Sequence, residues 1–195
     1  MDEQSKALKR RKLDPRYANR WFRGRGIDIG CGPDPMKVED WPNATEIVPH
    51  DVERGDSDAQ FMTGVPDASF DFAHSAHCLE HMRIAQTALT NWMRILKPGG
   101  FLVAAVPEEL LYECGKWPSR FNGDHKISFT MRGTPIIPSS TNLLWLLWKS
   151  RADVELMSLL TDEWDPSKFG QDQTLGPAEC ALEFVLRKPD STRPW

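Results

Sequence analysis

Residues 25–35 read Arg-Gly-Ile-Asp-Ile-Gly-Cys-Gly-Pro-Asp-Pro, and this stretch decides the fold. Two isoleucines flank an aspartate in the alternation of a β-strand, which two glycines and two prolines then end. Gly30 and Gly32 lack a Cβ, so the chain can turn sharply and a ligand can approach the backbone. Pro33 and Pro35 suit the first turn of a helix. The order strand, glycine turn, helix start predicts the nucleotide-binding corner of a doubly wound α/β sheet, with a plain tight turn as the alternative.

The residues around the turn indicate the class of ligand. A dinucleotide fingerprint places a third glycine where this chain has Pro35, so a pyrophosphate ligand is disfavoured. Asp28 would repel a phosphate and favours a cationic ligand, such as S-adenosylmethionine with its ammonium and sulfonium groups. The pattern acid-x-Gly-x-Gly resembles the first motif of the class I S-adenosylmethionine-dependent methyltransferases, although Asp34 replaces their usual third glycine. The resemblance implies cofactor contacts at four residues of the motif: Asp28, Gly30, Cys31 and Gly32.

Residues 66–81 carry the most specific signal in the chain, Pro-Asp-Ala-Ser-Phe-Asp-Phe-Ala-His-Ser-Ala-His-Cys-Leu-Glu-His. They resemble a block of the small class I methyltransferases of the methyltransferase-11-like type. The Lys-Pro-Gly-Gly sequence at 97–100, which ends a helix predicted over 82–96, is a second hallmark of these enzymes. The resemblance covers residues 24–106 and implies a Rossmann-like α/β fold. We therefore expect a mostly parallel seven-stranded sheet with an antiparallel last strand and helices on both faces.

Further cofactor contacts follow from the predicted strand ends. Asp51 ends the second predicted strand, where a carboxylate can accept hydrogen bonds from ribose hydroxyls; a solvated loop acid is the alternative. Asp58 begins a stretch that resembles the third-strand motif of the family. There the acid contacts the adenine amino group, and the next backbone N–H, of Ala59, contacts the ring. A slip of one residue would give the role of Asp58 to Asp56. Ser75 of the quoted block completes the implied cofactor set.

Composition and charge narrow the other possibilities. The 195 residues, 40% hydrophobic and 27% charged, predict one globular domain over 1–195. A net charge of −4 gives no general attraction to nucleic acid or to anionic membranes. Without a long apolar run or a signal-like start we expect a cytoplasmic protein with no membrane partner. Residues 1–23 predict a solvated helical cap, which in the resembling family covers the cofactor; the basic cluster at 6–12 leaves a nuclear-localisation or RNA-binding patch as alternatives.

The second half of the chain predicts a binding loop and the last elements of the sheet. Residues 107–140 show no periodicity and follow the presumed fifth strand, so we interpret them as a substrate-binding loop or lid. A helix is predicted over 141–150, and strands over 154–160 and 181–187. Four leucines are expected to pack the helix against the core: Leu143, Leu144, Leu146 and Leu147.

Two histidines are candidate catalytic bases. Transfer to a hydroxyl requires alignment with the methyl group and removal of a proton. His77 lies just past the fourth predicted strand, and His125 lies in the irregular loop. A neutral imidazole suits proton removal near neutral pH. A structural or substrate-contacting role is the alternative for each.

His77, Glu80 and His81 have helical i, i+3, i+4 spacing, which would place them on one helix face. The set resembles the ligands that hold a divalent metal in small-RNA 2′-O-methyltransferases and ubiquinone-pathway O-methyltransferases. Those families carry an acid where this chain has His77, so we predict no metal. We expect Glu80 and His81 to orient the loop around the cofactor and the substrate.

The predicted substrate-binding residues are His81, Arg120, Asp124 and Lys126. Arg120 and Lys126 can hold a carboxylate or a phosphate. Residues 107–130 resemble bacterial methyltransferases associated with surface-polysaccharide gene clusters, which favours a small polar acceptor. The expected reaction is methylation of a hydroxyl, less favourably an amine, of a polar, anionic or sugar-like molecule, with S-adenosylhomocysteine as product. Alternatives are an RNA or protein methyltransferase and a catalytically silent cofactor-binding partner, and the sequence does not determine the oligomeric state.

Overall fold

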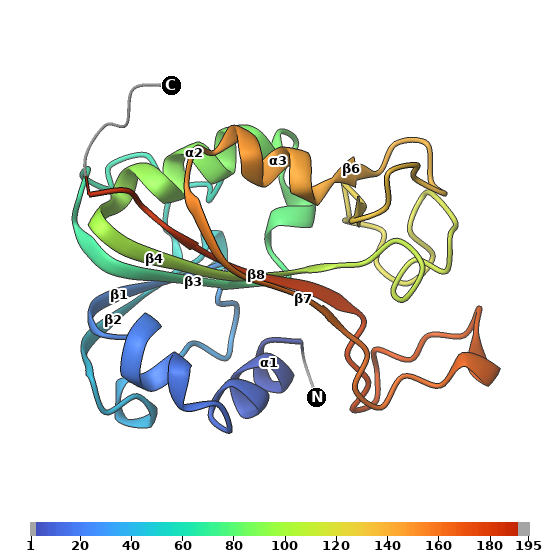
Figure 1. Ribbon diagram of the computed structural model, residues 1–195, viewed down its shortest axis with the longest axis horizontal. Helices are drawn as coiled ribbons and strands as arrows, with labels where there is room; N and C mark the ends of the chain where they lie inside the picture. The colour runs from blue at the N-terminus through green and yellow to red at the C-terminus, as the bar shows by residue number, and fades with distance from the viewer. Residues whose placement is uncertain (1–2, 191–195) are drawn as a thin grey trace.

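The computed structural model describes residues 3–190, and a central mixed sheet dominates it (Figure 1). Within these residues the sheet has six strands in the order β2-β1-β3-β4-β8-β7. The first four are parallel, and β8 runs antiparallel to both of its neighbours. The strands are β1 (Gly24–Ile29), β2 (Ala44–His50), β3 (Phe70–Ala76), β4 (Leu96–Pro107), β7 (Asp153–Leu160) and β8 (Ala181–Arg187). The predicted Rossmann-like α/β class and the antiparallel last strand are confirmed.

The seventh strand expected at Asp58 is not formed, so that prediction was wrong. The backbone N–H groups of Phe61 and Met62 donate instead to the Asp58 carbonyl, at 3.0 and 2.9 Å. The Asp58 carboxylate also accepts from the backbone N–H of Gln60 at 2.7 Å. These local hydrogen bonds stabilise a turn, and the backbone groups that make them are not paired with a neighbouring strand.

The helix start expected after the glycine turn is also absent. Residues 33–37 are irregular and lead only into a 3₁₀ turn, Val38–Asp40. The backbone N–H of Met36 donates to the Asp28 carboxylate at 2.7 Å, which holds the chain against β1. Because its backbone N–H binds Asp28, the chain at Met36 follows β1 and does not form a helical turn.

Helices cover both faces of the sheet, as predicted (Figure 1). On one face lie α1 (Glu3–Arg11) and a π-helical turn, Tyr17–Trp21; on the other lie α2 (Ala85–Ile95) and α3 (Leu143–Lys149). Side chains of β4 alternate between two apolar clusters, with Val103 on the α1 side and Leu102 on the α2 side. The remaining elements are β5 (Phe129–Thr130), β6 (Thr141–Asn142) and 3₁₀ turns at Val52–Arg54, Leu79–His81 and Pro166–Lys168.

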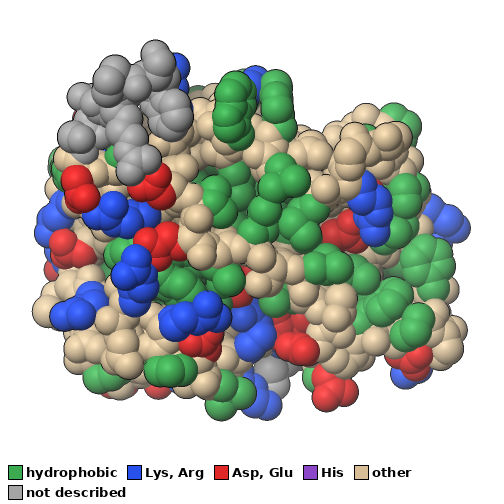
Figure 2. Space-filling view, in the orientation of Figure 1, with side chains coloured by type: hydrophobic (Ala, Val, Ile, Leu, Met, Phe, Trp, Pro, Cys, Tyr) green, Lys and Arg blue, Asp and Glu red, His purple; other side chains and the backbone are tan. Residues whose placement is uncertain are grey.

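Helix α3 buries only part of its leucine stripe. Leu143, Leu146 and Leu147 are buried, as their i, i+3, i+4 spacing requires. Leu144 is 48% exposed and lies in sequence beside the exposed Trp145, so its predicted core role was wrong. Figure 2 shows hydrophobic side chains gathered on the surface over α3. No helix within residues 3–190 has the length and apolar character needed to cross a membrane.

Part of the N-terminal basic cluster is buried against the protein while Lys9 and Lys12 are exposed, so the prediction of a solvated helix was wrong for Lys6 and Arg11. Arg11 is fully buried, with its Nε 2.5 Å from Glu183 Oε1. Arg10 and the Tyr17 hydroxyl each donate to the other oxygen of this carboxylate at 2.7 Å. Burial opposes ionisation of Glu183, but Arg11 and Arg10 lower the pKa of its carboxyl to about 2. A buried ion pair therefore fastens α1 to β8.

We predict that Glu183→Gln destabilises the fold by about 3–5 kcal/mol, because the buried Arg11 guanidinium loses its counter-charge. Urea unfolding of the two proteins at neutral pH measures the difference.

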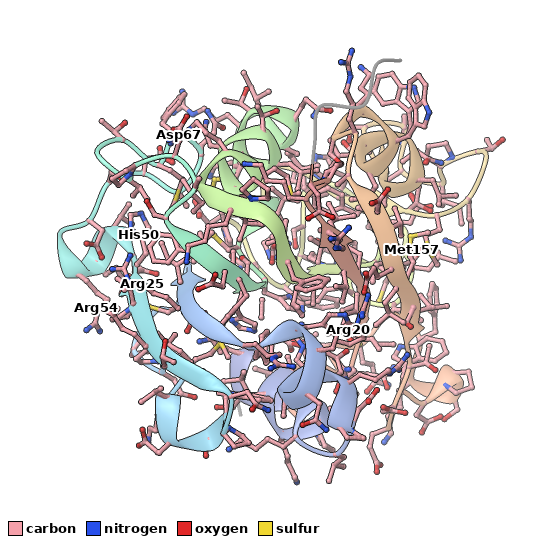
Figure 3. The ribbon with its side chains drawn as sticks, turned by 60° about the vertical axis from the view of Figure 1, so that its left-hand side comes forward. Arg20, Arg25, His50, Arg54, Asp67 and Met157 are labelled. Carbon is pink, nitrogen blue, oxygen red and sulfur yellow. The ribbon has the colours of Figure 1, made fainter. Side chains whose placement is uncertain are left out.

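The matched control is Glu155→Gln, which removes the carboxylate paired with the half-exposed Arg20. Figure 3 shows Arg20 beside β7, the strand that carries Met157. Exposed ion pairs contribute about 1 kcal/mol or less. An equal loss of stability in the two variants would contradict the importance given to the buried pair.

Candidate functional site

A cavity of about 740 Å³ opens at the carboxyl ends of β1, β2 and β3. Its volume suits a cofactor-sized ligand, and its position is the edge where α/β sheets bind ligands. Residues that directly follow the three strands contribute to its wall: Gly30, Asp51 and His77. The full lining is Gly30, Gly32, Pro33, Asp51, Val52, Glu53, Asp58, Ala59, Gln60, Phe61, His77, Cys78, His81, Met82, Arg83 and Asp124.

The glycine turn forms one wall of this cavity. Gly30 and Gly32 have φ values of +69° and +53°, in the left-handed region that favours glycine. A Cβ on Gly30 would lie 2.4 Å from Cys78 Sγ, whereas a Cβ on Gly32 would meet nothing within 4 Å. The backbone N–H of Gly32 donates to Asp51 Oδ2 at 2.9 Å. Asp51 therefore lies across the turn, and both predicted features share one cavity.

Asp28 does not line the cavity, which corrects the prediction that it faces a cationic ligand. Its carboxylate is fully buried and accepts from Gln4 Nε2 at 2.8 Å and from the backbone N–H of Met36 at 2.7 Å. His74 Nδ1 lies 2.5 Å away. Three internal partners thus hold Asp28 as an anchor beneath the turn.

The register of β1 and β3 accounts for the contact between Asp28 and His74. Asp28 of β1 lies opposite His74 of β3, so both polar side chains occupy adjacent positions in the buried sheet. Burial lowers the pKa of His74, which favours a neutral ring. A neutral ring can donate to Asp28 through Nδ1 and accept from Arg11 through Nε2, the two contacts that the ring makes.

Cys31 and Ser75 are also buried and absent from the cavity lining, contrary to their predicted cofactor contacts. The hydroxyl of Ser75 donates to the Ile29 carbonyl at 3.0 Å, which ties the ends of β3 and β1 together. Both side chains are buried next to the turn, outside the lining of the cavity.

Asp58 and Ala59, the predicted adenine contacts, line the cavity, whereas the alternative Asp56 does not. Asp56 accepts from the backbone N–H of Asp51 at 2.9 Å and is not part of the lining. Although the strand expected at Asp58 is missing, the turn that replaces it brings the same carboxylate to the cavity.

His77 lies where β3 reaches the cavity. Its φ is +54°, an uncommon backbone conformation for a residue other than glycine, and one often found at functional sites. Its Nδ1 and Nε2 lie 3.4 Å from carboxylate oxygens of Glu80 and Glu3, respectively. Burial alone would lower the pKa of His77, but these two carboxylates outweigh it and raise the pKa.

The other predicted acceptor-side residues lie in four different places. His81 and Asp124 line the cavity together, with His81 Nδ1 2.9 Å from Asp124 Oδ2. His125 is buried outside the lining, with Nδ1 2.7 Å from Glu113 Oε1. Lys126 is exposed and pairs with Asp124 at 2.6 Å. Arg120 lies in a different, open pocket of about 520 Å³ beside Trp117.

Arg83 is a cavity residue that the sequence analysis missed. It follows the Glu-His pair of the quoted block by two residues, but nothing in its local sequence distinguishes it from a solvated arginine. Its exposed guanidinium supplies a cation at the cavity. The cationic substrate contact predicted at Arg120 and Lys126 is thus available from a different residue.

We predict that Gly30→Ala destabilises the protein more than Gly32→Ala. Both require a left-handed alanine, which costs roughly 1–2 kcal/mol, but only the Gly30 variant adds a clash with Cys78. Thermal unfolding of the two variants measures the difference, and equal melting temperatures would contradict it.

Comparisons with known proteins agree with this geometry. A family described as "Methyltransferase domain" matches residues 27–104, and no curated protein matches the sequence. Among solved structures, an S-adenosylmethionine-dependent methyltransferase from Mesorhizobium loti has 16% identity and a TM-score of 0.60, covering 93% of this chain and 96% of its own.

Two further structures show the breadth of the fold. The phosphoethanolamine N-methyltransferase 2 of Haemonchus contortus, in complex with S-adenosylmethionine, has 15% identity and a TM-score of 0.60, covering 95% of this chain and 52% of its own. The [4+2]-cyclase SpnF has 19% identity and a TM-score of 0.65, covering 98% and 84%. Residues 27–104 match the methyltransferase-domain family, and the chain has the fold of solved S-adenosylmethionine-dependent methyltransferases, as the resemblance in the sequence implied.

Proposed function

We propose that this chain is an enzyme that binds S-adenosylmethionine in the 740 Å³ cavity and transfers the methyl group to a hydroxyl of a small polar acceptor. One observation carries the proposal. The glycine turn and Asp51, at the ends of β1 and β2, share a single cavity with His77 and His81, which follow β3. Donor-binding and acceptor-binding groups therefore meet in one place.

The donor would occupy the part of the cavity formed by the first two strands. Each oxygen of Asp51 already accepts one backbone N–H, from Gly32 or Glu53, and keeps a further lone pair for a ribose hydroxyl. Asp58 would accept from the adenine amino group, with the backbone of Ala59 beside the ring. These roles agree with the methyltransferase domain and with a neighbour that binds S-adenosylmethionine.

The acceptor would approach from the His77 side. The sulfonium of the donor supplies the leaving group, so the protein has to align the acceptor and remove its proton. Of the two candidate bases, His77 lines the cavity and His125 does not, which favours His77 as the proton acceptor. His125 is buried outside the cavity lining, so it would not contact the acceptor in this arrangement.

The charged lining supports a small polar and anionic acceptor. Arg83 would attract the negative group of the acceptor. The Asp124 carboxylate would accept a hydrogen bond from an acceptor hydroxyl, and the His81 ring would form another. A hydroxyl acceptor remains the proposal over an amine. Methylation of RNA is disfavoured, because Arg10, Arg11 and Lys6 of the basic cluster contact groups of the protein itself.

Turnover has to be measured as well as binding, because a fold hosts more than one chemistry. The [4+2]-cyclase among the neighbours is a case in point. Calorimetric titration with S-adenosylmethionine and S-adenosylhomocysteine tests the cavity. Release of S-adenosylhomocysteine with a panel of sugars, sugar acids and hydroxy acids tests the reaction.

We predict that Asp51→Asn weakens S-adenosylmethionine binding at least ~10-fold, because hydrogen bonds to a charged group contribute about 1.5–3 kcal/mol. Isothermal titration measures the affinity. Asp67→Asn is the matched control. Asp67 precedes β3 at the amino-terminal end of the strands, away from the cavity (Figure 3), and it pairs with Arg94. Equal affinities of the two variants would remove Asp51 from the proposed site.

We predict that His77→Ala lowers turnover about 10²- to 10⁴-fold, the usual contribution of a general base, with little change in donor affinity. His50→Gln is the control, because His50 is buried at the end of β2, and its Nε2 lies 2.9 Å from the Ser57 carbonyl (Figure 3). Retained turnover in His77→Ala would show that the proton leaves by another route.

A further inference from the structure

Behind the His81 side of the cavity, three side chains converge from two segments. Glu80, His81 and His125 place one nitrogen or oxygen atom each within 4.8 Å of one another. The segments are joined by the backbone, because the N–H groups of Lys126 and Ile127 donate to the Glu80 carbonyl at 2.7 and 3.1 Å. The fold, rather than helical spacing, therefore brings His125 to this cluster.

Glu80 has imidazoles as ion-pair neighbours but forms none of the close hydrogen bonds that a buried carboxylate requires. It is fully buried, and neither of its carboxylate oxygens has a hydrogen-bond partner. Two imidazole nitrogens lie near Oε1, His77 Nδ1 at 3.4 Å and His125 Nε2 at 3.9 Å. A buried charge without hydrogen bonds is costly, so the carboxylate is suited to a cation held among these groups.

The two imidazoles of the cluster are each held by a second carboxylate. His125 Nδ1 lies 2.7 Å from Glu113 Oε1, and His81 Nδ1 lies 2.9 Å from Asp124 Oδ2. A carboxylate at Nδ1 fixes the proton there and leaves the Nε2 lone pair for a ligand. Histidines that bind metals characteristically donate their other ring N–H in this way.

We propose that Glu80, His81 and His125 bind one divalent transition-metal ion in the wall of the cavity. Two imidazoles and one carboxylate suit Zn²⁺, Co²⁺, Mn²⁺ or Fe²⁺ better than Mg²⁺ or Ca²⁺, which prefer oxygen ligands alone. With bonds of about 2.1 Å, tetrahedral ligand atoms lie roughly 3.4 Å apart. The separations of up to 4.8 Å have to shorten by at most about 1.4 Å, which a change of side-chain rotamer can supply.

The ion would keep open positions toward the cavity, because only three protein groups hold it and His81 is part of the lining. This consequence rests on the proposed function: an acceptor hydroxyl bound there would have its pKa lowered by the metal. His77, 3.4 Å from Glu80, would then receive the proton. The inference replaces the prediction of no metal, which considered His77, Glu80 and His81 without His125.

The test uses the full chain without an affinity tag, freed of metal by a chelator and titrated calorimetrically with Zn²⁺ and Co²⁺. The expected result is one equivalent bound, with affinity at least tenfold lower in His81→Ala and in His125→Ala. His50→Gln, which removes a histidine outside the cluster, should bind as the unaltered protein does. Bound Co²⁺ should show visible absorption bands without the near-ultraviolet charge-transfer band of cysteine ligation.

Three results would overturn the proposal: no stoichiometric binding, unchanged affinity in His81→Ala, or a thiolate charge-transfer band. His81 is only partly buried, so its variant keeps the test valid if His125→Ala fails to fold. Circular dichroism establishes folding for each protein. Titration of the same samples with S-adenosylhomocysteine separates loss of the metal site from failure of the proposed cofactor site.

Discussion

The fold depends on one buried carboxylate, Asp28, and on the groups that hydrogen-bond to it. A carboxylate buried in the middle of a parallel sheet is costly unless its oxygens are hydrogen-bonded. Here Gln4, Met36 and His74 meet the carboxylate from an N-terminal helix, a loop and the next strand. The network ties three parts of the chain together directly beneath the glycine turn, so the shape of the cofactor wall depends on contacts that never touch the cavity.

The same network runs across the strands as far as β8, on the face of the sheet that α1 covers. His74 contacts Arg11, and Arg11 is paired with Glu183 of β8. The N-terminal helix α1 is therefore part of the core assembly, fixed at the turn by Gln4 and at β8 by Arg11. This explains how a domain with short connections after β1 and β2 keeps an ordered cavity: α1 supplies support on the face where the connections lack a long helix.

The cavity joins two kinds of polar group. Asp51 is half-buried and accepts from the backbone N–H of Gly32 in the glycine turn, and the exposed Asp58 accepts from the backbone N–H of Gln60. Near His77 the carboxylates and imidazoles are buried and face one another, which is the arrangement expected where protons or cations are handled. The first set suits recognition of a nucleoside, and the second suits chemistry on an acceptor. Their common cavity is the feature on which the proposed methyl transfer rests.

The sequence by itself determined the glycine turn, the six strands of the sheet and the cavity acids Asp51 and Asp58, because these depend on local patterns and short spacings. It misplaced Asp28, since a single carboxylate reads alike whether it faces a ligand or a buried histidine on the next strand. It missed the meeting of Glu80 with His125 for the same reason. Only the tertiary structure decides which charges become partners, because burial and pairing depend on segments that are distant in the chain.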